Sequence, residues 1–488
     1  MMQRWDLSVD LRAALHLVGV LVKWFSVAFA LPLIYAIFAR EAWWPYVVPG
    51  VLALIGGWAV ERAAFTERDI RPREGFLVVA LAWLIVAGLG AMPFVLLGVL
   101  DSIGAYFEAM SGFTTTGASV IAHVEGLPKA LLLWRAFTQW LGGMGIIVLA
   151  VALLPKLGVG GSQLMDAEAP GPTLERLTPR IRETARLLWG IYVGLTALDV
   201  LLLVFVGKLS LFDAVAHAFT TLSTGGFSTR DAGFVSFSGA AQWITILFMI
   251  CGGLNFALLY RTIARRHWRA LLTDTEARFY GALLLGAALF ILLSLGIDAE
   301  NLRHSAFQAV SIMTTTGYAS TDFESWNPAA KMILLVLMFL GGCAGSTAGS
   351  IKVIRTWLVF RFIVRETRNV IHPQAVLPIR VSGRVVSEEI VRAVAIFAIL
   401  YVTIFAFGSI VLLWDVARAG LNMGIIEAAS AVAATLGNVG PGFGIVGPMS
   451  TYAQLPETSK ILLVFLMWAG RLELFPVLVL FVRSYWKG

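Results

Sequence analysis

The sequence contains very little cysteine, and its histidines are not clustered. Cys251 and Cys343 are the two cysteines, and both lie inside apolar runs. This scarcity argues against a disulfide framework and against a multi-cysteine metal site. The histidines form no pair with the spacing of metal ligands, so we expect structural or interfacial roles for all six. They are His16, His123, His217, His267, His304 and His372.

Charged residues are also scarce. Asp, Glu, Lys and Arg make up 14% of the 488 residues, whereas an average soluble protein has about a quarter. Hydrophobic residues make up 58%, and the mean hydropathy is +0.82. This composition excludes an ordinary soluble domain and predicts a membrane protein.

Long apolar runs recur along the whole chain. Crossing about 30 Å of hydrocarbon takes roughly 20 apolar residues in a helix. The first run is too long for a removable signal peptide and lacks the small-residue cleavage site. Ten runs are predicted to be transmembrane helices: 14–39, 43–60, 76–100, 131–154, 186–206, 240–260, 279–297, 330–360, 389–414 and 459–482.

Lys and Arg are concentrated in one set of connecting segments. The linkers 62–75, 156–186, 261–278 and 352–384 contain 21 of them. The alternating connections, 101–131, 208–239, 298–331 and 415–460, contain only 7. The positive-inside rule therefore places the first set in the cytoplasm. With ten spans, both termini are also expected there.

A short motif recurs in each of the connections that are poor in Lys and Arg. The four copies are TTTG at 114–117, LSTG at 222–225, TTTG at 314–317 and GNVG at 437–440. Each follows a short apolar stretch, about half the length of a membrane span, which is typical of a re-entrant helix. The chain is therefore predicted to contain four repeats of about 100 residues after an initial helical pair.

The loop that follows each short helix cannot face lipid, because its backbone groups would lack hydrogen-bond partners. Four such loops on one axis would form a pore, and inward-pointing helix C-termini would favour a cation there. Backbone carbonyls are suitable ligands for a bare cation, and glycine permits the backbone angles that this requires. A single copy of TTTG would be an ordinary polar turn; four copies in equivalent places favour the pore.

The segments SGFTTTGAS, STGGFS, MTTTGY and GNVGPGFG, each between two spans, closely resemble the Trk/Ktr/HKT superfamily of cation transporters. Within it they are most similar to the bacterial TrkH/TrkG potassium-uptake membrane subunits. The resemblance covers nearly the whole chain, including the N-terminal helix pair. It implies an all-α polytopic membrane protein, with four pseudo-repeated helix–pore-loop–helix units around one axial pore, in the bacterial inner membrane.

This resemblance implies domain boundaries and filter residues. The N-terminal transmembrane helix pair would occupy 1–74, and the pore repeats 75–160, 161–270, 271–370 (with an interrupted second helix) and 371–488. Gly117 matches the potassium-selective pattern, whereas a serine there accompanies sodium selectivity in plant relatives. Potassium would be bound by the carbonyls of Thr115, Thr116, Gly117, Ser223, Thr224, Gly225, Thr315, Thr316, Gly317, Asn438, Val439 and Gly440. The fourth loop departs from the others, with Asn438 and Val439 in place of threonines.

Two further features lie inside predicted spans. The run GGCAGSTAGS at 341–350 interrupts a span, which is tolerated where the backbone lines a cavity. In the resembled family this run is an intramembrane gate below the filter, here comprising Gly341, Gly342, Gly345, Ser346, Thr347, Gly349 and Ser350. Close helix packing through small residues is the alternative. Lys352 follows directly and must snorkel or find a partner.

In the last span, Arg471 and Glu473 lie in an apolar run, and ionisable residues at such depth are functional candidates. The resemblance implies that Arg471 projects into the pore as a barrier below the filter. Glu473 is expected to contact a neighbouring span and not Arg471. A buried Arg–Glu structural pair is the alternative.

The chain is expected to carry no nucleotide site. Gly442, Gly444 and Gly447 match the dinucleotide fingerprint, but no strand precedes them, and no P-loop motif occurs. The resemblance implies a homodimer, regulated by a cytoplasmic nucleotide-binding TrkA-type subunit that docks on the basic linkers.

Two other functions compete with a potassium pore. Broken helices also occur in secondary transporters of small solutes, although that class usually shows two repeats and not four. An intramembrane hydrolase would need a nucleophile with a base or a metal pair, and neither is visible in the sequence. We therefore expect a transporter and not an enzyme.

Overall fold

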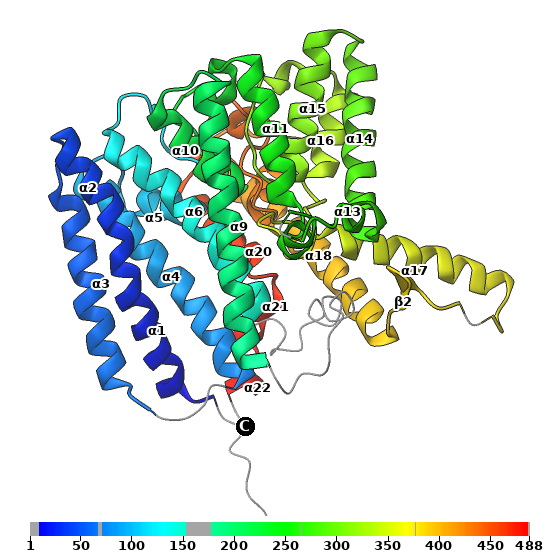
Figure 1. The fold of residues 1–488 in the computed structure, drawn as a ribbon, viewed down its shortest axis with the longest axis horizontal. Helices are drawn as coiled ribbons and strands as arrows, with labels where there is room; N and C mark the ends of the chain where they lie inside the picture. Colours follow the sequence, from blue (N-terminus) through cyan, green and yellow to red (C-terminus); the bar gives the residue numbers. More distant parts are fainter. Residues whose placement is uncertain (1–8, 67–70, 153–176, 264, 376, 487–488) are drawn as a thin grey trace, which may run out of the picture.

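The computed structural model describes residues 9–66, 71–152, 177–263, 265–375 and 377–486. The chain begins with α1 (Leu11–Phe25), continues through the turn η1 (Ser26–Phe29) into α2 (Ala30–Ala39), and returns as α3 (Trp44–Ala63). Glycines let α1 and α3 approach closely, because a Cβ at Gly19 or Gly57 would lie within 3.0 Å of the opposite backbone. The pair stands at one edge of the molecule (Figure 1).

The rest of the chain repeats one arrangement four times. In each repeat a long helix enters, a short helix follows, and a third helix returns. The repeats comprise α4 (Pro72–Leu96), α5 (Ser102–Phe113) and α6 (Lys129–Ala152); α9 (Leu177–Phe205), α10 (Leu211–Leu222) and α11 (Gly239–Gly253) with α12 (Phe256–Ile263); α14 (Thr275–Leu295), α15 (Ala299–Met313) and α16 (Pro328–Leu337) with α17 (Val353–Ile371); and α18 (Glu388–Arg418), α19 (Ile425–Leu436) and α20 (Glu457–Arg471) with α21 (Phe475–Leu478).

The short helices α5, α10, α15 and α19 confirm the expected half-length elements. Three of them begin at a side-chain N-cap: Asp101, Ser210 and Asp298 accept hydrogen bonds from backbone N–H groups of the first turn. In α19 the Glu427 carboxylate instead accepts from the backbone N–H of Gly424. The second half of each helix is almost wholly buried, so its C-terminal end lies inside the protein.

Three of the ten expected spans are not continuous helices. α11 and α12 meet at 110°, and α20 meets the segment Phe475–Phe481 at 115°. α16 ends at Leu337, and α17 begins only at Val353. Within the described ranges, five helices are long and apolar enough to cross a membrane, or up to seven if each bent pair counts as one span. The interruption at 341–350 was expected from its run of small residues, whereas the breaks at Asn255 and Glu473 were not predicted.

Local sequence explains two of these breaks. α11 ends at Gly252–Gly253, and Asn255 then caps α12 by accepting hydrogen bonds from the backbone N–H groups of Ala257 and Leu258. After α20, Glu473 and Leu474 both have left-handed backbone angles, with φ of 62° and 61°. Non-glycine residues rarely adopt these angles, so the chain turns sharply at this point.

The two described ends of the chain meet at the start of α4. The backbone N–H of Asp10 donates to Glu74 Oε1 at 3.0 Å, and the Tyr485 hydroxyl donates to the Arg73 carbonyl at 2.7 Å. The start of α1 and the final helix α22 (Arg483–Trp486) accordingly lie at the same end of the molecule (Figure 1). Both ends thus lie on the side of the basic linker 62–75, as expected.

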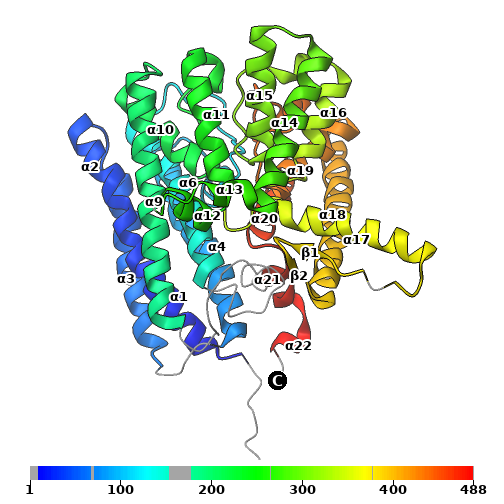
Figure 2. The same cartoon turned by 45° about the vertical axis from the view of Figure 1, so that its right-hand side comes forward.

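Regular structure outside the helical repeats is limited in the described residues. A connecting helix, α13 (Arg269–Thr273), precedes α14. A two-stranded hairpin, β1 (Arg380–Val381) and β2 (Arg384–Val385), follows α17 (Figure 2). Short 3-10 turns complete the structure: η3 (Gly233–Ser236), η4 (Phe323–Ser325), η5 (Gly444–Val446), η6 (Tyr452–Gln454) and η7 (Val479–Phe481). The predicted all-α membrane fold is confirmed; the expected boundary at 160 lies outside the described residues, as does most of the linker 156–186.

Candidate functional site

The four short helices are followed by loops with the same backbone conformation. We define these as loop 1 (114–117), loop 2 (223–226), loop 3 (314–317) and loop 4 (437–440). The second residue of each loop is left-handed, with φ of 52° at Thr115, 53° at Thr224, 58° at Thr315 and 55° at Asn438. The fourth residue is a left-handed glycine, with φ of 81° at Gly117, 79° at Gly226, 78° at Gly317 and 106° at Gly440. The four repeats therefore superimpose residue by residue through this segment.

This register differs from the expected one in loop 2. The sequence motif paired Ser223, Thr224 and Gly225 with Thr115, Thr116 and Gly117. The structure pairs Thr224, Gly225 and Gly226 with them, because α10 ends one residue later relative to the motif than α5 does. Gly226 was therefore missed. The consecutive glycines Gly225 and Gly226 were the signal that could have revealed the ambiguity.

The four loop glycines form a closed ring of contacts. A Cβ at Gly117 would lie within 3.0 Å of the Gly225 carbonyl oxygen in loop 2, and one at Gly226 equally close to the Thr316 carbonyl in loop 3. A Cβ at Gly317 would meet the Val439 carbonyl in loop 4, and one at Gly440 would lie 2.7 Å from the Thr116 carbonyl in loop 1. Each glycine thus leaves room for the carbonyl of the next loop, and the fourth loop returns to the first.

Three of the left-handed residues are threonines, which rarely adopt this conformation because they are β-branched. The left-handed conformation of each threonine costs about 1–3 kcal/mol of folding free energy, and it persists only where the surrounding structure imposes it. All three are fully buried. Strain at Thr115, Thr224 and Thr315 in three equivalent places marks this ring as a candidate functional site. Asn438 occupies the fourth place and tolerates the conformation better.

Two side-chain oxygens in the ring have no hydrogen-bond partner among the described residues. They are Thr115 Oγ1 and Asn438 Oδ1, and both are buried. Buried polar atoms are usually partnered, so both remain free to accept a ligand. The hydroxyl pairs Thr114–Thr116 and Thr314–Thr316 instead bond to one another, at 2.7 Å and 2.8 Å.

Loop 4 is held by side chains that the threonine loops do not have. Asn438 Nδ2 donates to Thr116 Oγ1 in loop 1 and to the Met467 carbonyl in α20, both at 3.0 Å. The Tyr452 hydroxyl donates to the Gly440 carbonyl at 2.8 Å. The departure seen in the sequence of loop 4 therefore still fits the ring.

Gln139 was not singled out from the sequence, although it bonds directly to loop 2. Its Nε2 donates to the Gly225 carbonyl at 2.6 Å, and its Oε1 accepts from the Phe227 backbone N–H at 3.1 Å. It is fully buried in α6, which belongs to the first repeat. A lone glutamine in an apolar span was the signal that could have identified it.

The unwound segment, Gly341 to Ser350, lies against the inner ends of three loops. The Thr347 hydroxyl donates to the Leu222 and Gly252 carbonyls, both at 3.0 Å, at the end of α10 and in α11. The backbone N–H of Gly349 donates to Thr315 Oγ1 at 2.7 Å. A Cβ at Gly349 would collide with the Gly437 carbonyl. The segment therefore packs against loops 2, 3 and 4.

Arg471 reaches the same segment from the end of α20. Its Nη1 donates to the Thr347 carbonyl at 2.8 Å, and Nη2 lies 3.5 Å from the Gly142 carbonyl. The residue is 2% exposed, and its Nε has no partner among the described residues. A buried guanidinium thus bonds to the unwound segment that packs against the loops.

Glu473 contacts a neighbouring helix, as expected, and not Arg471. Its Oε2 accepts from Arg355 Nη2 of α17 at 2.5 Å. Glu473 lies in the sharp turn after the end of α20, which directs it away from Arg471. Lys352 is buried and donates to the Ala348 carbonyl, so it finds a partner inside the unwound segment.

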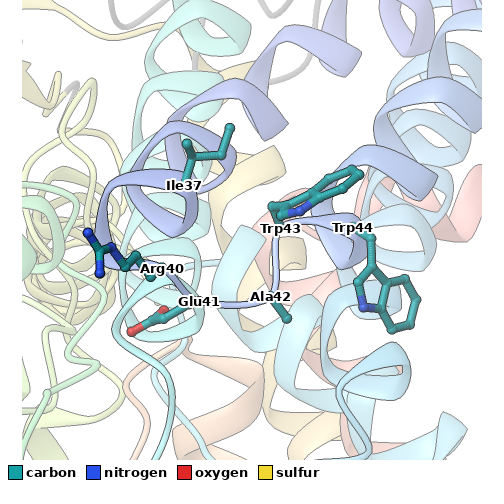
Figure 3. A pocket seen from close by; sticks show the side chains of 6 residues that line it. All are labelled: Ile37, Arg40, Glu41, Ala42, Trp43 and Trp44. Atoms are coloured by element: carbon teal, nitrogen blue, oxygen red, sulfur yellow. The ribbon is translucent and has the colours of Figure 1, made fainter.

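A surface hollow of about 720 Å³ lies at the turn between α2 and α3. Arg40 and Glu41 lie on one side of the turn, and Trp43 and Trp44 on the other (Figure 3). The Glu41 carboxylate accepts from the Lys129 and Ala130 backbone N–H groups at 3.0 and 2.9 Å, which fixes the turn to the start of α6. The hollow contains no residue of the ring.

The sequence is similar to that of known cation transport proteins. Residues 51–487 match the family described as TrkH, cation transport protein. The Trk system potassium uptake protein TrkH of Halomonas elongata is 39% identical over 98% of this chain and all of its own length. TrkH of Escherichia coli K12 is 38% identical over 98% of this chain and 99% of its own.

Among solved structures, the potassium transporter TrkH from Vibrio parahaemolyticus superimposes with a TM-score of 0.88 and 35% sequence identity. That match covers 98% of this chain and all of the other. The chain therefore belongs to the TrkH family of cation transport proteins.

Proposed function

We propose that this protein takes up potassium through a selectivity filter formed by loops 1 to 4. The ring of glycine contacts carries the proposal, because it joins four equivalent loops around one axis in a single chain. A single axial path suits an ion pore better than the two-repeat plan of most secondary transporters. The names of the relatives, which are potassium uptake proteins, support potassium as the ion.

Backbone carbonyls would be the main ligands of the ion. Carbonyl rings can replace the hydration shell of potassium without a buried formal charge. With the register of loop 2 corrected, the ligands come from Thr115, Thr116 and Gly117; Thr224, Gly225 and Gly226; Thr315, Thr316 and Gly317; and Asn438, Val439 and Gly440. The C-terminal ends of the short helices add partial negative charge nearby.

The unwound segment would act as a gate, and Arg471 as a barrier. The segment bonds to Thr224 in loop 2 and Thr315 in loop 3, and it consists of small residues, which permit a change of backbone conformation. Arg471 places a positive charge next to the unwound segment, because its guanidinium donates a hydrogen bond to the Thr347 carbonyl. Movement of the segment would therefore open the path and shift the charge together.

The protein would function as a homodimer in the bacterial inner membrane, with both termini in the cytoplasm. The side of the basic linkers would bind a cytoplasmic TrkA-type nucleotide-binding subunit. Both described ends of the chain lie on that side, which supports this orientation.

Ion flux into liposomes that contain the purified protein tests the proposal. We expect potassium and rubidium to enter under an imposed voltage, sodium to enter more slowly, and choline to be excluded. Equal entry of all four cations, or none, would refute a selective potassium filter. Entry of an organic solute in place of potassium would favour a secondary transporter.

A further inference from the structure

A buried ion pair lies directly behind the ring, between α5 and α6. Arg135 Nε donates to Glu108 Oε1 at 2.6 Å, and the two side chains are 5% and 0% exposed. Both belong to the first repeat, and nothing in the filter or gate described above uses them. Burying two charges in a membrane protein is costly, so the pair needs an explanation.

Glu108 holds the chain that leaves loop 1. Its carboxylate accepts hydrogen bonds from the Ser119 hydroxyl at 3.0 and 3.1 Å, and from the Val120 backbone N–H at 2.9 Å. Ser119 lies two residues after the loop glycine Gly117. The carboxylate is thus bonded to α6 on one side and to loop 1 on the other.

Arg135 holds the chain that leaves loop 2. Its Nη1 donates to the Ser228 carbonyl at 2.9 Å, and its guanidinium lies 3.6 Å above the Phe227 ring. Phe227 directly follows the loop glycine Gly226. The ion pair therefore bridges the exits of two neighbouring loops, and charge-assisted hydrogen bonds make this bridge stiff.

The position of Glu108 has a structural equivalent in each repeat. Seven residues before the left-handed residue lie Glu108, His217, Gln308 and Ala431. His217 Nε2 bonds to Ser228 Oγ at 3.0 Å, and the Gln308 amide donates to the Tyr318 carbonyl at 3.2 Å and accepts from the Ser320 backbone N–H at 2.8 Å. In the fourth repeat the neighbouring Ser430 accepts from the Phe443 backbone N–H at 2.8 Å.

Three of the short helices therefore hold the chain after their loop from this position, and α19 does so from the neighbouring residue. In the described residues, only the first repeat uses a carboxylate paired with an arginine that also reaches the next loop. The exits of loops 1 and 2 are thus linked by a buried ion pair.

We propose that Glu108 and Arg135 are positioning residues that set the separation of loops 1 and 2 and thereby the ion preference of the ring. The proposal rests on the filter function proposed above. Selectivity depends on the placement of the carbonyl ligands, and the pair bonds to both chains within a few residues of those carbonyls. The pair contacts the loops and not the ion path, so it acts through the backbone.

Three variants test this proposal: Glu108→Gln, Arg135→Met and the double variant. Glutamine can still accept from Ser119 and Val120 but leaves Arg135 without a counter-charge. The double variant contains no unpaired charge, so it should fold better than either single change. It should still lose the link to Ser228. We expect all three to lower the ratio of potassium to sodium flux by roughly three- to tenfold.

The ion pair Lys23–Glu61 is the control. It joins α1 to α3, with 2.5 Å between Lys23 Nζ and Glu61 Oε2, and neither helix belongs to a pore repeat. The double variant Lys23→Met with Glu61→Gln should keep the wild-type flux ratio. Flux ratio and thermal midpoint are measured on the same purified proteins in liposomes and detergent.

The outcomes separate the two proposals. A wild-type protein without potassium preference would refute the filter itself, whatever the variants do. With a selective wild type, a stable double variant that keeps the wild-type flux ratio overturns the positioning role. Failure of all three variants to fold would assign the pair to folding and would equally overturn it.

Discussion

The Arg471 guanidinium donates a hydrogen bond to the Thr347 carbonyl, with 2.8 Å between Nη1 and the oxygen. This bond joins the end of α20 in the fourth repeat to the unwound segment of the third. The same Thr347 also donates its hydroxyl to the Leu222 carbonyl of the second repeat. One residue of the proposed gate therefore connects three of the four repeats.

Arg471→Ala should increase potassium flux while leaving the preference of the ring for potassium nearly unchanged. The variant removes both the positive charge and the bond that holds the unwound segment. At an effective dielectric of about 20, two unit charges some 6 Å apart repel by roughly 3 kcal/mol, which is a sizeable barrier. Potassium and sodium flux are measured in liposomes.

Arg471→Lys is the matched control, because it keeps the charge but shortens the reach to Thr347. Flux that rises only in the alanine variant assigns the effect to charge, whereas a rise in both assigns it to the lost bond. A stable alanine variant with unaltered or reduced flux would contradict the barrier. Glu473 should not be left unpaired in either, because its partner is Arg355.

Deleting the unwound segment Gly341 to Ser350 should also raise potassium flux. The segment bonds to Thr224 in loop 2 and Thr315 in loop 3, so we expect its removal to open the proposed ion path. Liposome flux is compared with the thermal midpoint of the purified variant. A well-folded deletion with wild-type flux would favour the interpretation that these small residues serve only helix packing.

Gly226→Ser should lower the ratio of potassium to sodium flux, as should Gly117→Ser. Both glycines are left-handed, and a Cβ at either would collide with a carbonyl of the next loop. Gly126→Ser is the control, since a Cβ there meets nothing within 4 Å. An unchanged ratio in Gly226→Ser would contradict the register that the structure assigns to loop 2.

Asp199→Asn should stabilise the protein, by about 1–3 kcal/mol. Asp199 is fully buried in α9, and neither carboxylate oxygen has a partner in the part of the chain that the structure describes. Removing an unpaired acid from the membrane interior removes a desolvation cost. The thermal midpoint in detergent measures the change.

Asp415→Asn is the comparison, and we expect the opposite sign. Its carboxylate in α18 is also buried, but it accepts from Thr458 Oγ1 at 2.5 Å, Ser459 Oγ at 2.7 Å and Arg418 Nη2 at 2.8 Å. Replacing one oxygen by an amide leaves some of these donors without an acceptor. Equal destabilisation by both changes would mean that the Asp199 carboxylate has favourable interactions of its own.

The repeat plan could be predicted from the sequence because composition and length encode it. The half-length apolar stretch before loop 4, for example, became the short helix α19 (Ile425–Leu436). The sharp breaks near Asn255 and Glu473 could not be predicted in this way. They depend on capping and on left-handed residues, to which hydropathy is insensitive.

The positions of the loops could be predicted, but their contacts could not. The four glycine-ended motifs predicted the positions of the loops. The register of loop 2 depends on where α10 ends, and the consecutive glycines Gly225 and Gly226 made that register ambiguous in the sequence. The partners of Glu108 and Gln139 lie in other elements, up to 88 residues away. Such contacts depend on tertiary packing and leave little trace in local sequence.

The closed ring of loops also bears on how the chain folds. Asn438 Nδ2 bonds to Thr116 Oγ1 across a sequence separation of 322 residues. Loop closure over such a distance carries a large entropic cost before any contact offsets it. Loop 1 emerges early in synthesis, yet its partner in loop 4 emerges only near the end. The ring can therefore close only after loop 4 has been synthesised. Until then the Thr116 carbonyl lacks its contact with Gly440.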